Sequence, residues 1–133
     1  MTTSAELRQP CPPGACNCGR ERLQGRPDAD SRILRLTRAE EKRLLERLEN
    51  IQSLSDLERL QRRLYEQLGL RVAIAPGHHE VRSMRGIAIH IDELPGLCRK
   101  TRQSIPAAIR RGLEKHPQIA YRLLDAHDLF RDA

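Results

Sequence analysis

The first regular alternation of apolar and polar positions in the chain has the spacing of one helix face. Its apolar members are Leu44, Leu45, Leu48 and Ile51, with Glu and Arg at most of the positions between them. This spacing of three to four residues predicts an amphipathic helix over residues 37–50. Thr37 stands three positions before Glu40, as in a capping box, so we expect the helix to begin there.

A second stripe of leucines follows after a short connection. Its members are Leu57, Leu60, Leu64 and Leu68. They predict a helix over residues 53–68, which Ser53 or Ser55 is suited to cap and Gly69 is suited to end. Because only residues 50–52 separate the two helices, we expect them to form an antiparallel helical hairpin.

The period then changes from that of a helix to that of a strand. Apolar residues at alternate positions are Leu70, Val72 and Ile74, and then Ile87, Ile89 and Ile91. They predict two strands with one apolar face each, joined as a β-hairpin. A two-stranded ribbon is marginal alone, so we expect it to pack on the helices. Residues 78–85 are expected to be partly strand and partly an exposed tip.

Two further helices are expected after the chain breaks at Leu94-Pro95-Gly96. The pattern predicts one over residues 104–115, capped by Ser104 and with Pro106 in its first turn, where a missing N–H costs nothing. Pro117 ends this helix and begins another, expected over residues 117–130.

These elements predict an α+β fold of order ααββαα. The chain of 133 residues has room for one domain, which we place at residues 31–133. Residues 1–30 lack apolar periodicity and are rich in cysteine and proline. We expect them to form an irregular tail that a metal would order.

Four cysteines are the first candidate for chemistry. They are Cys11, Cys16, Cys18 and, far downstream, Cys98. Four thiolates complete a tetrahedral set for zinc, although a Cys-x-Cys pair is tighter than the usual zinc spacing. His78, His79 or His90 could replace one thiolate, and a tail Cys-x-Cys pair also suits copper. The first residues lack the apolar core of a secretory signal, so we expect a cytoplasmic protein with reduced thiols.

A basic segment is the second candidate. Residues 97–115 hold a single carboxylate, Glu114, and six of the 24 Lys and Arg residues: Arg99, Lys100, Arg102, Arg110, Arg111 and Lys115. We expect the first three to precede the helix over residues 104–115, whose N-terminus favours an anion. The segment is thus a candidate for phosphate contacts, with nucleic acid or an acidic protein surface as partner.

Composition narrows the class of function. The chain has two Tyr, one Phe and no Trp, which excludes an aromatic platform for stacking bases. It shows no phosphate-binding loop, nucleophile elbow or dinucleotide-binding glycine pattern, and no apolar run long enough to span a membrane, so we expect neither an enzyme nor a membrane protein. The favoured function is a nucleic-acid-associated or regulatory accessory protein.

Two alternatives of other classes stay open. The leucine-striped helical hairpin would suit a protein–protein adaptor or a homodimer. The cysteines would suit a metal or redox sensor. A helix-turn-helix over residues 104–130 is weaker, because Asp125, Asp128 and Asp132 would bring negative charge to DNA.

Overall fold

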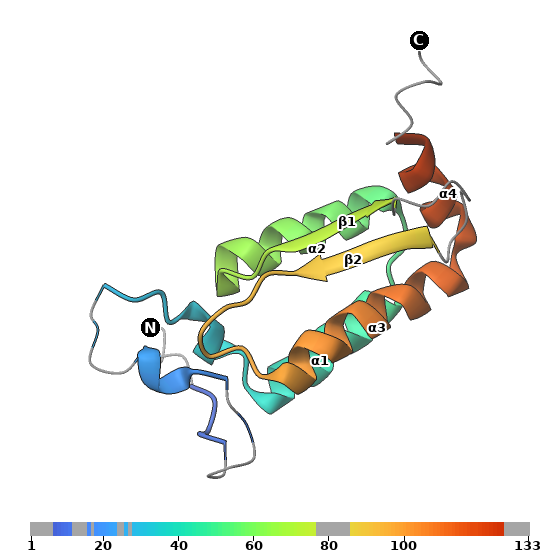
Figure 1. The fold of residues 1–133 in the computed structure, drawn as a ribbon. Coiled ribbons are helices and arrows are strands. Elements are labelled where there is room, and N and C mark those ends of the chain that lie inside the picture. The colour runs from blue at the N-terminus through green and yellow to red at the C-terminus, as the bar shows by residue number, and fades with distance from the viewer. Residues whose placement is uncertain are drawn as a thin grey trace, which may run out of the picture.

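The computed structural model describes residues 7–11, 16, 18–23, 26, 28–76 and 86–126. Four α-helices and one two-stranded antiparallel sheet follow one another in the predicted order, with two short 3-10 helices before them (Figure 1). The predicted α+β fold is confirmed. Among the helices in these ranges, none combines the length and apolar character needed to cross a membrane.

The first two helices begin and end where their sequence signals indicate. Helix α1 spans Arg38–Glu49, and the side chain of Thr37 caps it by accepting a hydrogen bond of 3.2 Å from the Glu40 N–H. Helix α2 spans Leu54–Leu68, and Ser53 caps it in the same way through the Asp56 N–H, at 3.0 Å. Gly69 ends α2 in the left-handed conformation, with φ of 72°, which glycine adopts without a steric penalty.

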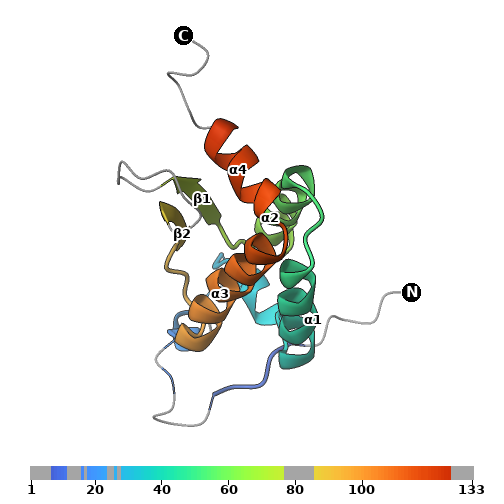
Figure 2. The ribbon, with the colours of Figure 1, turned by 90° about the vertical axis from the view of Figure 1, so that its right-hand side faces the viewer.

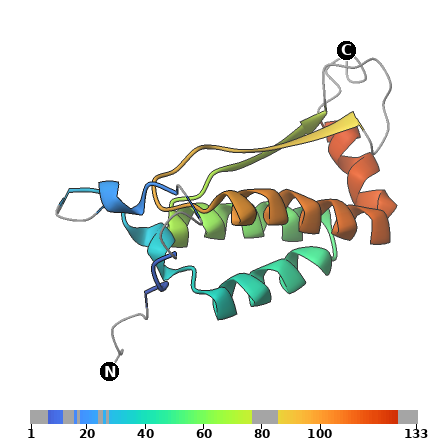
Figure 3. The same ribbon diagram turned by 60° about the horizontal axis from the view of Figure 1, so that its bottom comes forward.

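Helices α1 and α2 follow one another in antiparallel directions, as predicted, but α1 has its main packing contacts with another helix. That helix is α3, which spans Arg99–Lys115 (Figure 3). Gly112 of α3 permits this approach, since a Cβ there would lie 2.5 Å from the carbonyl oxygen of Leu48. Between α1 and α2 a groove of about 580 Å³ stays open, with Leu36, Leu44, Leu64 and Leu68 among the residues that line it.

The sheet covers the side of α2 and α3 that faces away from α1 (Figure 3). Strand β1 spans Val72–Pro76 and strand β2 spans Ile87–Ile91, paired antiparallel with Val72 opposite Ile91 and Ile74 opposite Ile89. Val72, Ile74, Ile87 and Ile91 are buried in the core, and Ile89 packs against its edge. The predicted apolar face of the ribbon is therefore confirmed. Residues 77–85, which include the predicted tip, lie outside the described residues.

Helix α3 begins five residues earlier than the sequence pattern indicates. Its N-cap is Cys98, and Ser104 and Pro106 lie inside it. Instead of capping, the Ser104 hydroxyl donates a hydrogen bond of 2.8 Å to the Lys100 carbonyl oxygen. Burial explains the extension, because Thr101 and Ile105, which are 5% and 0% exposed, continue the buried face of the helix. The expected start at Ser104 is therefore wrong.

Helix α4 spans Pro117–Ala126 and closes one end of the domain. It starts at Pro117 as predicted, and it contacts α2, α3 and β1. Figure 2 shows α4 at one end of the domain, and the described residues of the N-terminal segment (residues 1–30) at the other end. The rest of the expected helix, residues 127–130, lies outside the described residues.

The described residues of the N-terminal segment lie against the opposite end of the domain from α4 (Figure 1). They include the short helix η1, Arg20–Arg22, and the segment leads into η2, Arg32–Arg35. Ile33 and Leu34 of η2 are part of the core, and the Leu34 carbonyl oxygen accepts a hydrogen bond of 2.7 Å from the Arg8 N–H. The segment predicted to be an irregular tail is thus in direct contact with the folded domain.

Candidate metal centre

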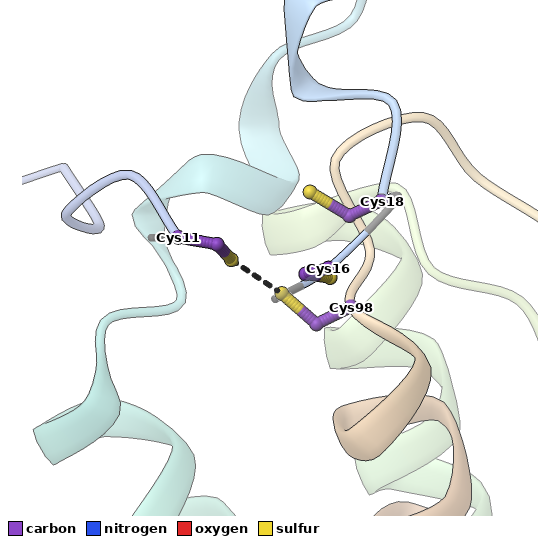
Figure 4. Close-up of side chains that lie close together, drawn as sticks. All are labelled: Cys11, Cys16, Cys18 and Cys98. Carbon is purple, nitrogen blue, oxygen red and sulfur yellow. Dashed lines mark hydrogen bonds between the residues drawn. The ribbon is translucent and has the colours of Figure 1, made fainter. Parts of the chain in front are cut away.

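The cysteine sulfurs meet where the N-terminal segment touches the start of α3. Three of them come from the N-terminal segment, and Cys98 comes from the N-cap position of α3 (Figure 4). The four Sγ atoms, those of Cys11, Cys16, Cys18 and Cys98, lie within 4.8 Å of one another. The residues that the sequence nominates as a ligand set are therefore brought together by the fold.

The sulfur separations suit a single metal ion. Four sulfurs bound at about 2.3 Å to one tetrahedral zinc lie about 3.8 Å from each other. The Sγ atoms of Cys11 and Cys98 are 3.5 Å apart, and every pair of Sγ atoms in the cluster lies within 4.8 Å, so the separations are compatible with that value. All four cysteines are free thiols and half-buried, and 3.5 Å is far longer than a disulfide bond of about 2.05 Å.

A tight turn holds Cys98 in this position. The Gly96 N–H donates a hydrogen bond of 2.7 Å to the Cys18 carbonyl oxygen, and the Leu97 N–H donates one of 3.0 Å to the Leu94 carbonyl oxygen. Gly96 has φ of 91°, and a Cβ there would lie 2.9 Å from side-chain carbons of Ile33 and Leu23. Only glycine satisfies both the backbone conformation and the close packing. The turn therefore places Cys18 and Cys98, two of the four candidate ligands, next to each other.

The thiols of the cluster differ in acidity. Burial and the hydrogen bond with Cys11 raise the pKa of the Cys98 thiol. The pKa of Cys16 is lowered: burial opposes the shift, but hydrogen bonds from the Cys98 thiol and from the backbone N–H of Arg99 outweigh it. Since Arg99 is the first residue of α3, the start of this helix favours a thiolate at Cys16. Thiolates are the species that bind metal ions.

A buried arginine borders the cluster. Arg8 is 9% exposed, and its Nη2 lies 3.8 Å from the Cys18 Sγ. Among the described residues no carboxylate pairs with Arg8, and its Nε has no hydrogen-bond partner. Sequence reasoning missed this residue, because one arginine among many in an irregular segment carries no signal. Its burial appears only when the segment is docked.

Histidine does not belong to the cluster in the part of the chain that the structure describes. His90 is exposed on β2, and its Nε2 lies 3.3 Å from an oxygen of Asp92. The cysteine cluster is the group of possible metal ligands found among the described residues, and it contains no histidine. The other two candidates, His78 and His79, lie outside those residues.

The basic residues of the second candidate site separate into two groups. Arg102 lies 3.4 Å from a carboxylate oxygen of Glu93, and Arg111 pairs with Glu49 of α1. The others are exposed and have no carboxylate partner in the described ranges: Arg99, Lys100, Arg110 and Lys115. The expectation that the first three cations precede the helix is wrong, since α3 begins at Arg99. Because α3 starts early, Arg99, Lys100 and Arg102 lie in its first turns.

The leucine stripe of α2 faces inward. Leu57, Leu60, Leu64 and Leu68 are 0–8% exposed and belong to the core. Helix α2, which carries the stripe, contacts η2, β1 and α4 of the same chain. Leu64 and Leu68 line the groove between α1 and α2, but the stripe as a whole is buried.

The four cysteines define the class of site in this protein: a set of thiols from two distant parts of the chain, close enough to hold a metal ion. Comparison of the chain with protein-family models, with curated proteins and with solved structures found no match in any of the three.

Proposed function

We propose that this protein binds one zinc ion through the thiolates of four cysteines, and that the ion has a structural role. The observation that carries the proposal is the convergence of the Sγ atoms of Cys11, Cys16, Cys18 and Cys98 within 4.8 Å. Four protein ligands fill the tetrahedral shell of zinc and leave no position for a reacting water, as in structural zinc sites.

Zinc is favoured over other metals that bind thiolates. A multi-iron cluster distributes its cysteine ligands over several irons and would hold their sulfurs farther apart than 4.8 Å. Copper(I) is soft enough for thiolates, but it prefers fewer ligands than four. A four-thiolate tetrahedron around a single ion is the arrangement most typical of zinc.

The ion would join the N-terminal segment to the domain. Three ligands belong to that segment and the fourth to the start of α3, so one ion would close a loop of more than 80 residues. Other described contacts across this boundary are the backbone hydrogen bonds from Arg8 to Leu34 and from Gly96 to Cys18, and the packing of Leu23 against the core. Metal binding therefore supplies folding free energy for the segment.

The test is the metal content of chain purified under reducing conditions without a chelator. We expect about one zinc per chain by elemental analysis, a value that follows from one four-thiolate site. The double variant Cys16→Ser and Cys18→Ser should lose the metal, whereas the control His90→Gln should keep it. A cobalt-substituted protein should absorb visible light as tetrahedral thiolate sites do. Retention of zinc by the double variant would contradict the proposal.

We propose separately that the exposed cations of α3 bind phosphate groups of nucleic acid. In support, Arg99, Lys100, Arg110 and Lys115 are exposed and unpaired with carboxylates in the described ranges. Such contacts are sensitive to salt and blind to base sequence.

This second proposal is tested with duplex DNA of mixed sequence. The variant Arg99→Gln/Lys100→Gln should reduce the slope of log affinity against log salt by about 2, one for each phosphate that the variant no longer neutralises. The matched control Arg38→Gln/Lys42→Gln removes the same charge from exposed positions of α1 and should leave the slope unchanged. Equal effects from both pairs, or an unchanged slope in the first, would count against phosphate binding at α3.

A further inference from the structure

The burial of Arg8 needs a negative charge nearby. A guanidinium taken out of water is costly unless a counter-charge and hydrogen-bond acceptors surround it. Arg8 is only 9% exposed, and no carboxylate among the described residues pairs with it. In the described ranges its guanidinium donates a hydrogen bond to the Cys18 sulfur, 3.8 Å from Nη2.

The backbone of Arg8 is fixed on both sides. Its N–H donates a hydrogen bond of 2.7 Å to the carbonyl oxygen of Leu34, and its own carbonyl oxygen accepts one from the Arg20 guanidinium. Leu34 belongs to the hydrophobic core, so the backbone of Arg8 is anchored to a core residue. From this anchored position the side chain reaches the cysteine cluster, where Nη2 contacts the Cys18 sulfur.

A metal-loaded cluster would supply the missing charge. Four thiolates around one divalent cation leave two negative charges in a half-buried place. A cation in contact with a ligand sulfur offsets part of that charge and donates a charge-assisted hydrogen bond. Groups around the ligands commonly set the affinity of a metal site in this way.

We propose that Arg8 is the charge-compensating residue of the cysteine cluster, and that it strengthens metal binding without being a ligand. This inference rests on the proposed zinc site. It adds a fifth residue to that site and assigns a function to a buried arginine that the fold alone does not explain.

The experiment measures zinc affinity by competition with a chromophoric chelator, using the full chain. Arg8→Met keeps much of the volume and removes the charge, and we expect affinity to fall about 10- to 100-fold. Arg22→Met removes the same charge from an exposed position of η1 and should bind zinc like the wild type. Arg8→Lys restores a cation and should recover part of the loss.

The outcomes separate this inference from the zinc proposal. If the wild-type chain binds no zinc, both are overturned. If Arg8→Met binds zinc as tightly as the wild type and Arg22→Met, the inference is overturned and the zinc site stands. If Arg8→Met and Arg8→Lys weaken zinc equally, and both lower the melting temperature of the zinc-free chain equally, Arg8 has a structural role only. The inference is supported if Arg8→Met binds zinc more weakly, Arg8→Lys recovers part of the affinity, and the melting temperature of the zinc-free chain is unchanged.

Discussion

Cys11 and Cys98 stand 87 positions apart in the sequence, and their sulfur atoms lie 3.5 Å apart in the folded chain. The first belongs to a segment with little regular structure, and the second begins a helix of 17 residues. Their contact therefore links a segment in which Arg8 is the one buried residue among those described to the part of the chain that contains the core. A metal ion that binds both sulfurs would therefore hold the N-terminal segment against the start of α3.

Removal of metal should release the N-terminal segment and leave the domain folded. The core of leucines, isoleucines and other apolar residues is formed by η2, the four α-helices and the sheet, and it includes no cysteine. With a strong chelator under reducing conditions, we expect amide hydrogen exchange to rise in residues 7–11 and 18–23 while α1–α4 stay protected. Restoring zinc should reverse the change. Loss of protection in α1 and α3 as well would show that the metal supports the whole fold.

Gly112→Ala should destabilise the domain, although alanine usually favours a helix. At an open helical site this change gains about 1 kcal/mol. Here a Cβ would lie 2.5 Å from the carbonyl oxygen of Leu48 and 3.0 Å from a side-chain carbon of Ile51. A backbone atom cannot give way easily, so α1 and α3 would have to move apart, and we expect a net loss of about 1–3 kcal/mol. The measurement is the free energy of unfolding in urea. An unchanged or higher value would mean that the two helices separate freely.

Local signals in the sequence predict much of this fold. Thr37 and Ser53 cap their helices as the spacing of side chains indicates, and Gly69 ends α2. The alternation around Val72 and Ile91 identifies both strands and their buried face. These features succeed because each depends on neighbours within about four residues, or on a strict period of two.

Features that depend on distant residues could not be predicted in this way. Ser104 followed by Pro106 is typical of a helix start. However, α3 begins more than one turn before Ser104, because Thr101 is buried in the fold. The main packing partner of α1 is α3 rather than its neighbour α2, and the lack of a side chain at Gly112 permits this close approach. Likewise, the four cysteines are a candidate set in the sequence, whereas the place of Arg8 beside them emerges only from the docked segment.

Asp56 should make the stability of the protein depend on pH. Its carboxylate is 7% exposed, pairs with Arg47 and accepts a hydrogen bond of 3.0 Å from the Gln52 N–H. The hydrogen bond from Arg47 is the main cause that lowers the pKa of Asp56, against the opposing effect of burial. A carboxyl whose pKa is lower in the folded state stabilises the fold above its unfolded value of about 3.9. This contribution disappears as the pH falls through the folded value.

The variant Asp56→Asn isolates this effect. We expect it to lose about 1–3 kcal/mol of unfolding free energy at neutral pH, because it weakens hydrogen bonds to a charged, buried acceptor. The difference from the wild type should shrink as the pH is lowered below about 4. Asp30→Asn is the control: Asp30 also pairs with an arginine, Arg32, but it is exposed, so its loss should cost less than about 1 kcal/mol. A difference independent of pH would show that Asp56 contributes through packing.

The substitution Pro106→Ala tests whether α3 begins at Arg99. Proline has no N–H, and in the interior of a helix it leaves the carbonyl oxygen four residues before it without its usual partner, at a cost of about 3 kcal/mol relative to alanine. Proline also lowers the conformational entropy of the unfolded chain, which stabilises the folded protein by about 0.4–1 kcal/mol. With α3 beginning at Arg99, Pro106 is interior, so Pro106→Ala should raise the free energy of unfolding by about 1–3 kcal/mol. A helix beginning at Ser104 would instead hold this proline in its first turn, where it costs nothing, and the variant would gain no stability. Urea unfolding of the two chains therefore distinguishes the two starts, and with them the position of Cys98 at the N-cap.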